Sequence, residues 1–175
     1  NGILEQFQVW EASNFEPELQ AQFPEIRAYS GKGISDPGAR LKLSISPQGI
    51  KTMVFRTGTL NEYIEPYSED RTVYAVFKSQ RVKGGLPWMC STEEAQMAVG
   101  IDNQLQASRI ESNTGQLKVI RLAQSCNGEY SNYFGAFNSS QVALVLAAFN
   151  ATLARTNGCY ENDLALHLYL IPTTT

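Results

Sequence analysis

The chain has 175 residues and a mass of 19.4 kDa, a length that suits one medium domain or two small ones. Its 43% hydrophobic residues are enough to bury a core, which excludes global disorder, and its net charge of −3 argues against a nucleic-acid partner. No apolar run approaches the roughly 18 residues that span a bilayer. A single histidine, His167, excludes a catalytic zinc site of three histidines built from this chain alone.

Short alternating segments fill the first eighty residues. Residues 41–45 show this most clearly, because Leu and Ile lie on one face and Lys42 and Ser44 on the other. Asn14 and Pro17 predict the start of a short helix over 17–22. Strands are predicted over 7–10, 26–29, 41–45, 52–56, 60–67 and 73–77, and turns over 30–33, 36–38 and 46–49. A spacing of roughly ten residues between strands is typical of an antiparallel meander or a small sandwich.

The last sixty residues have a different period. Residues 117–123 are a strand candidate, and an apolar helical stripe follows Ser139-Ser140: Val142, Val145, Leu146, Phe149 and Leu153. Asn157-Gly158 predicts the end of this helix, and 164–170 alternates as a strand. Strand, helix and strand in this order predict a parallel βαβ unit. Because two strands and one helix cannot cover their own apolar faces, we expect this unit to need more sheet than the chain supplies.

Both ends of the chain indicate a piece of a longer precursor. The first residues, Asn1-Gly2-Ile3-Leu4, contain no initiator methionine and no signal-peptide pattern, so we expect a secreted protein whose signal peptide has been removed. The last residues stop shortly after an apolar strand-like run, which we interpret as a fragment boundary. Between the two halves, the polar residues 79–85 and 102–115 predict a linker.

Cys90 is the residue with the clearest candidate chemistry. Pro87 disfavours helix around it, and Gly84-Gly85 lets the backbone lie close to another segment. A cysteine thiolate is a strong zinc ligand. An extended segment that carried Cys90 to a catalytic zinc would displace the attacking water.

The sequence Pro87-Trp88-Met89-Cys90 resembles the cysteine-switch motif Pro-Lys-Met-Cys-Gly-Val-Thr in the propeptides of reprolysin (adamalysin) zinc metalloproteases. Trp88 stands in place of the lysine of the motif, and Ser91 in place of its glycine. Residues 118–123, 126–130 and 148–164 resemble the opening strand, first helix and second strand of catalytic domains in secreted bacterial reprolysin-like proteases. The resemblance covers about half of the chain.

This resemblance implies an α+β chain in three parts. They are a mainly antiparallel β propeptide unit over 1–80, an inhibitory segment and linker over 81–115, and the first βαβ part of an incomplete α/β metzincin catalytic domain over 116–175. The inhibitory segment would be Pro87, Trp88, Met89 and Cys90, with Cys90 as the zinc ligand that keeps the protease latent.

The parent protein implied by the resemblance is a secreted zinc metalloendopeptidase. The family's histidine motif, H-E-x-x-H-x-x-G-x-x-H, is absent from this sequence, so we expect its zinc ligands further along the same precursor and no peptidase activity from this chain alone. The expected partners are the remainder of the catalytic domain and the parent's protein or peptide substrates, with no nucleic acid and no membrane.

Other interpretations of these residues stay open. Cys90 could instead form a disulfide, and Trp88 could fill a protease pocket or pack within the propeptide. Cys126 and Cys159 are expected at opposite ends of the βαβ unit and therefore not paired with each other. His167 is interpreted as a packed residue rather than a ligand. For the whole chain, the alternative function is a secreted, non-enzymatic, β-rich adhesion or carbohydrate-binding module.

Overall fold

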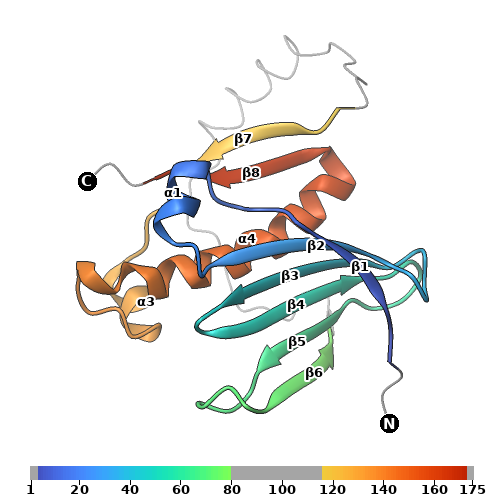
Figure 1. Ribbon diagram of the computed structural model, residues 1–175, viewed down its shortest axis with the longest axis horizontal. Coiled ribbons are helices and arrows are strands. Elements are labelled where there is room, and N and C mark those ends of the chain that lie inside the picture. Colours follow the sequence, from blue (N-terminus) through green and yellow to red (C-terminus); the bar gives the residue numbers. More distant parts are fainter. Residues whose placement is uncertain (1–3, 80–115, 173–175) are drawn as a thin grey trace, which may run out of the picture. The chain divides into compact units, whose positions relative to one another are not determined.

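The computed structural model describes residues 4–79 and 116–172, and their largest feature is an antiparallel sheet, here called the meander (Figure 1). Its six strands lie side by side in chain order: β1 (Phe7–Glu11), β2 (Arg27–Gly33), β3 (Arg40–Ser46), β4 (Gly49–Phe55), β5 (Glu62–Pro66) and β6 (Tyr74–Lys78). Helix α1 (Pro17–Gln22) lies between β1 and β2 in the chain, at the predicted residues. The predicted antiparallel meander and its short helix are confirmed.

Strand β2 extends through residues 30–33, where the sequence predicted a turn. Gly31 lies opposite Val9 of β1 and Leu41 of β3, so this stretch is paired on both sides. A Cβ atom on Gly33 would lie 2.1 Å from the carbonyl oxygen of Asp36. The prediction was wrong because this glycine provides space for the following turn to fold back against the strand, and does not form the turn itself.

The second part of the chain forms the βαβ unit, made of β7 (Lys118–Leu122), α4 (Val142–Leu164) and β8 (Leu166–Leu170). Strands β7 and β8 pair in parallel, as predicted. Two short helices were not predicted: α3 (Gly128–Tyr133) and the 3₁₀ helix η1 (Ser139–Gln141). The side chain of Asn127 caps α3 by accepting a hydrogen bond from the backbone N–H of Tyr130 at 3.0 Å.

Helix α4 does not end at Gly158 as predicted but continues to Leu164. It stops at Ala165, which has the left-handed conformation at φ 52°. At Gly158 a Cβ atom would lie 2.5 Å from Cε2 of Phe55. The glycine therefore allows the helix to pack closely against β4 and does not mark the helix end. Among the described residues, no helix is long and apolar enough to cross a bilayer.

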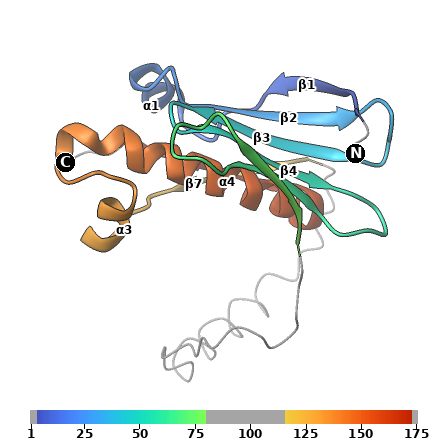
Figure 2. The ribbon, with the colours of Figure 1, turned by 90° about the horizontal axis from the view of Figure 1, so that it is seen from below.

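Helix α4 packs against β2, β3 and β4 of the meander and against β8. Figure 2 shows it lying along one face of the meander. The shared core has members from both parts of the chain: Phe15, Leu19, Ile26, Ala136, Val145, Leu146, Ala147, Phe149, Leu153 and Leu170. Asn1–Ser79 and Leu117–Thr175 accordingly form one compact unit. The prediction that the βαβ unit needs more sheet than the chain supplies was wrong for α4, because the meander of the same chain covers this helix.

The face of β3 toward α4 is its polar face. Lys42 and Ser44 are 8% and 3% exposed, whereas Ile45 on the other face is 36% exposed. Lys42 lies opposite Ser30 of β2, which is also buried. The sequence pattern gave the strand and its alternation correctly. It did not indicate that the polar side is covered, because the covering helix has polar side chains of its own.

Candidate functional site

The predicted inhibitory segment lies outside the described residues. Pro87, Trp88, Met89 and Cys90 belong to the range 80–115, so their placement stays a prediction. Within the described residues, buried charged and polar side chains cluster where the meander packs against the βαβ unit. We call this contact region the seam, and it is the candidate functional site.

A largely buried ionic cluster lies in the seam, with side chains that are 7–24% exposed. Nζ of Lys42 lies 2.5 Å from Oε2 of Glu161 and donates to Oγ of Ser30 at 2.8 Å. The other carboxylate oxygen of Glu161 lies 2.7 Å from Nδ1 of His167. Nε2 of His167 lies 3.2 Å from the carbonyl oxygen of Ser13. One carboxylate on α4 thus connects a lysine of the meander to the histidine of β8.

The surroundings of Glu161 favour its charged form. Burial raises the pKa of this carboxyl, but hydrogen bonds from His167 and Lys42, together with their charges, outweigh burial, so its pKa lies below the ordinary range. Glu161 is therefore a carboxylate at neutral pH. Its two oxygens are shared between two basic side chains, which makes it the connecting member of the cluster.

His167 is a packed residue, as the sequence analysis expected. It is 5% exposed, and both ring nitrogens face oxygen atoms of Glu161 and Ser13. Among the described residues, no group of three or more histidine, cysteine or acidic side chains is placed to hold a metal ion. The described part of the chain therefore does not fit a zinc centre.

A network of three buried asparagines lies beside the ionic cluster. Nδ2 of Asn14 donates to Oδ1 of Asn150 at 2.9 Å, and Nδ2 of Asn157 donates to Oδ1 of Asn14 at 2.9 Å. Asn150 also donates to Oγ of Ser44 and to the carbonyl oxygen of Arg27, both at 3.0 Å. Asn150 is 1% exposed, so the Asn-x-Thr glycosylation signal that begins at this residue is accidental.

Sequence reasoning did not find this network, although a signal was present. Asn150 and Asn157 are seven residues apart in a helix that is buried over much of its length, so they lie on one face about two turns apart. Polar residues at that spacing within a buried helix need partners across the interface. The partner from the meander side, Asn14, lies in the segment between β1 and α1, which has no pattern that points to α4.

A cavity of about 440 Å³ opens beside the ionic cluster. Its lining includes Trp10, Arg40, Lys42, Glu161 and His167. The volume lies within the range of small-molecule sites, which are commonly about 300–1,000 Å³. Because Lys42, Glu161 and His167 line the cavity, it is part of the seam and not a separate site.

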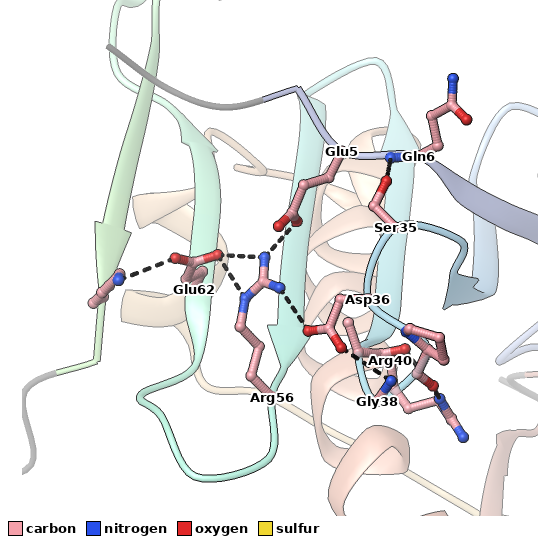
Figure 3. Close-up of polar contacts among 11 residues, drawn as sticks. Glu5, Gln6, Ser35, Asp36, Gly38, Arg40, Arg56 and Glu62 are labelled. Atoms are coloured by element: carbon pink, nitrogen blue, oxygen red, sulfur yellow. Dashed lines mark hydrogen bonds and ion pairs between the residues drawn. The ribbon is translucent and has the colours of Figure 1, made fainter.

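A second ionic cluster joins the loops and edge strands of the meander (Figure 3). The guanidinium of Arg56 contacts three carboxylates, at 2.5 Å from Glu5, 3.1 Å from Asp36 and 2.8 Å from Glu62. Lys78 lies 3.3 Å from Glu62 on its other side. The hydrogen bond from Arg56 is the main cause that lowers the pKa of Glu62. Arg56 is 15% exposed, so this cluster has a structural role in fixing the strand ends.

The other two cysteines are free thiols. Cys126 is exposed after β7, and Cys159 is half-buried near the end of α4. An apolar cavity of about 410 Å³ lies beside Cys126, lined by residues such as Val145, Phe149 and Leu170.

No family model, curated protein or solved structure matches this chain. The resemblance to reprolysin-like proteases therefore rests on the sequence motifs alone.

Proposed function

We propose that this chain is the N-terminal portion of a secreted zinc metalloendopeptidase zymogen. In this proposal the meander belongs to the propeptide, the βαβ unit begins the metzincin catalytic domain, and Cys90 keeps the enzyme latent. The Cys90 thiolate binds the catalytic zinc at the position of the attacking water, whose removal leaves the site without a nucleophile. The zinc ligands and the substrate site lie on the remainder of the catalytic domain.

The observation that carries the proposal is the βαβ unit and the exposed apolar side chains on its strand β7. Strands β7 and β8 are parallel and joined through α4, which is how the resemblance expects the catalytic domain to begin. Within the described residues, β7 has β8 as its only neighbour in the sheet, and Val119 and Ile120 on β7 are 55% and 45% exposed. An apolar edge strand of this kind favours further strands from the rest of the precursor.

The test is a Cys90→Ser variant of the full-length precursor. We expect this variant to hydrolyse a peptide substrate without processing, whereas the wild-type precursor stays latent. Cys126→Ser is the matched control, because Cys126 is an exposed free thiol and its loss should leave latency intact. A Cys90→Ser precursor as latent as the wild type would contradict the proposal.

The reading frame that follows residue 175 provides a second test. The proposal requires an H-E-x-x-H-type motif in roughly the next hundred residues. The alternative, a non-enzymatic binding module, predicts no such motif and no peptidase activity in either cysteine variant.

A further inference from the structure

The meander and the βαβ unit are joined by backbone as well as by side chains. Phe15 forms a parallel bridge with Leu170 of β8. The backbone N–H of Leu170 donates to the carbonyl of Asn14 at 2.8 Å, and the N–H of Glu16 donates to the carbonyl of Leu170 at 3.0 Å. On the side of β8 opposite β7, the N-terminal part of the chain thus provides the neighbouring strand segment.

The apolar contact between the two parts is fully buried. Phe15, Leu19 and Ile26, all from the N-terminal part, are 1–2% exposed. They belong to one core cluster with Phe149 and Leu153 of α4. Separation of the two parts would expose this core to water on both sides, so the hydrophobic effect holds them together without a covalent link.

Polar contacts make the same surface specific. The Asn14–Asn150–Asn157 network and the Lys42–Glu161 pair both cross from one part to the other. Gln48 donates to the carbonyl of Leu144 at 2.9 Å, and Arg155 pairs with Glu65 at 2.5 Å. These contacts extend along most of α4. A buried asparagine tolerates few alternative partners, so the surface of α4 and β8 fits this meander and not an arbitrary sheet.

From these contacts we infer that residues 4–79 remain bound to residues 117–172 when the chain is cut between them. The interaction surface is the meander-facing side of α4 together with the edge of β8 opposite β7, and its partner is the chain's own N-terminal segment. This inference stands on the described contacts alone. Its consequence for regulation rests on the proposed function. Hydrolysis of one peptide bond after Cys90 places Cys90 on the N-terminal fragment, and this fragment stays bound to residues 117–172. Activation of the protease then needs a second event that separates the meander from α4.

The experiment uses the 175-residue chain with a recognition sequence for a specific protease inserted between Ser91 and Gly115. Denaturing electrophoresis measures the extent of cutting, and native size-exclusion chromatography with light scattering measures association. We expect both fragments to elute together in equal amounts at about 1 µM, at the position of the uncut chain. Separate elution of the N-terminal fragment overturns the inference. If the inserted site resists cutting, a Gly/Ser replacement of residues 92–115 that carries the same site takes its place.

An interface variant and a matched control test the surface itself. Asn150→Ala removes the central amide and should weaken association of the cut fragments by at least about tenfold. Asn132→Ala, at an exposed asparagine on α3 outside the interface, should leave association unchanged. If Asn150→Ala does not fold, Lys42→Met is compared instead. Equal weakening by the interface and control variants overturns the inference. Association needs no peptidase activity, so this result is independent of the Cys90→Ser test.

Discussion

Gly158 lies in the interior of α4, where this helix packs closely against Phe55 of β4. In the sequence it follows Asn157, and this pair of residues is typical of a helix end. The structure gives it another role, because the ring of Phe55 occupies the space where a side chain would begin. A single sequence does not distinguish these two uses of glycine, since the difference depends on a residue about a hundred positions away.

The Gly158→Ala substitution tests this role. Alanine favours helix over glycine by about 1 kcal/mol, but overpacking a tight contact costs about 1–3 kcal/mol. We therefore expect a net loss of up to about 2 kcal/mol in the free energy of unfolding, measured by urea denaturation. The added Phe55→Leu substitution should recover part of the loss. If Gly158→Ala stabilises the protein, the close approach of α4 and Phe55 is wrong.

At the scale of elements, periodicity predicted all six strands of the meander and the parallel βαβ unit. Alternation and turn residues are local properties, so the sequence contains them. The side of each strand that is buried is not local. Strand β3 buries Lys42 and Ser44 and leaves Ile45 partly exposed. The two polar side chains are buried because α4 supplies Glu161 and Asn150 as their hydrogen-bond partners. The seam could therefore not be predicted from the sequence, although each of its residues is present there as an ordinary polar residue.

The Glu161→Gln substitution tests the ionic cluster between these elements. At neutral pH it removes charge from two hydrogen bonds, each of which contributes roughly 1.5–3 kcal/mol when one partner is ionised. Glutamine retains part of each bond as a neutral hydrogen bond of about 0.5–1.5 kcal/mol, so we expect the free energy of unfolding at pH 7 to fall by about 2–3 kcal/mol in total. Urea denaturation of the variant and the wild type at pH 7 and at about pH 3 measures this difference and its dependence on pH.

The sign of the pH dependence follows from the lowered pKa of Glu161. A carboxyl with a depressed folded-state pKa stabilises the protein above its unfolded pKa of about 4.3, and this stabilisation is lost as pH falls through the folded-state value. The difference between the variant and the wild type should therefore shrink at acidic pH. Glu69→Gln, at an exposed carboxyl, is the control and should show little difference at either pH. A deficit of equal size at both pH values would show that the charge of Glu161 is not the cause.

At the scale of the whole molecule, the segments before residue 80 and after residue 116 fold into one unit with one core. The change of hydrophobic period along the chain correctly indicated two kinds of architecture. It did not indicate that they share a core, because contacts between Phe15 and α4 span more than a hundred residues and leave no periodic signal. The excess of apolar residues around α4 was the one visible hint, since a helix that is apolar on most sides needs cover on most sides.

A shared core predicts that the meander and the βαβ unit unfold together. Phe15 is 2% exposed and lies in the core between them, so Phe15→Ala should cost about 3–5 kcal/mol. Native-state hydrogen exchange resolved by segment measures this loss separately in β3 and in α4. We expect the opening free energy to fall by the same amount in both. Val76→Ala, at a side chain 72% exposed on β6, should change neither. If β3 loses protection in Phe15→Ala while α4 keeps it, the two parts fold independently and the common core does not couple them.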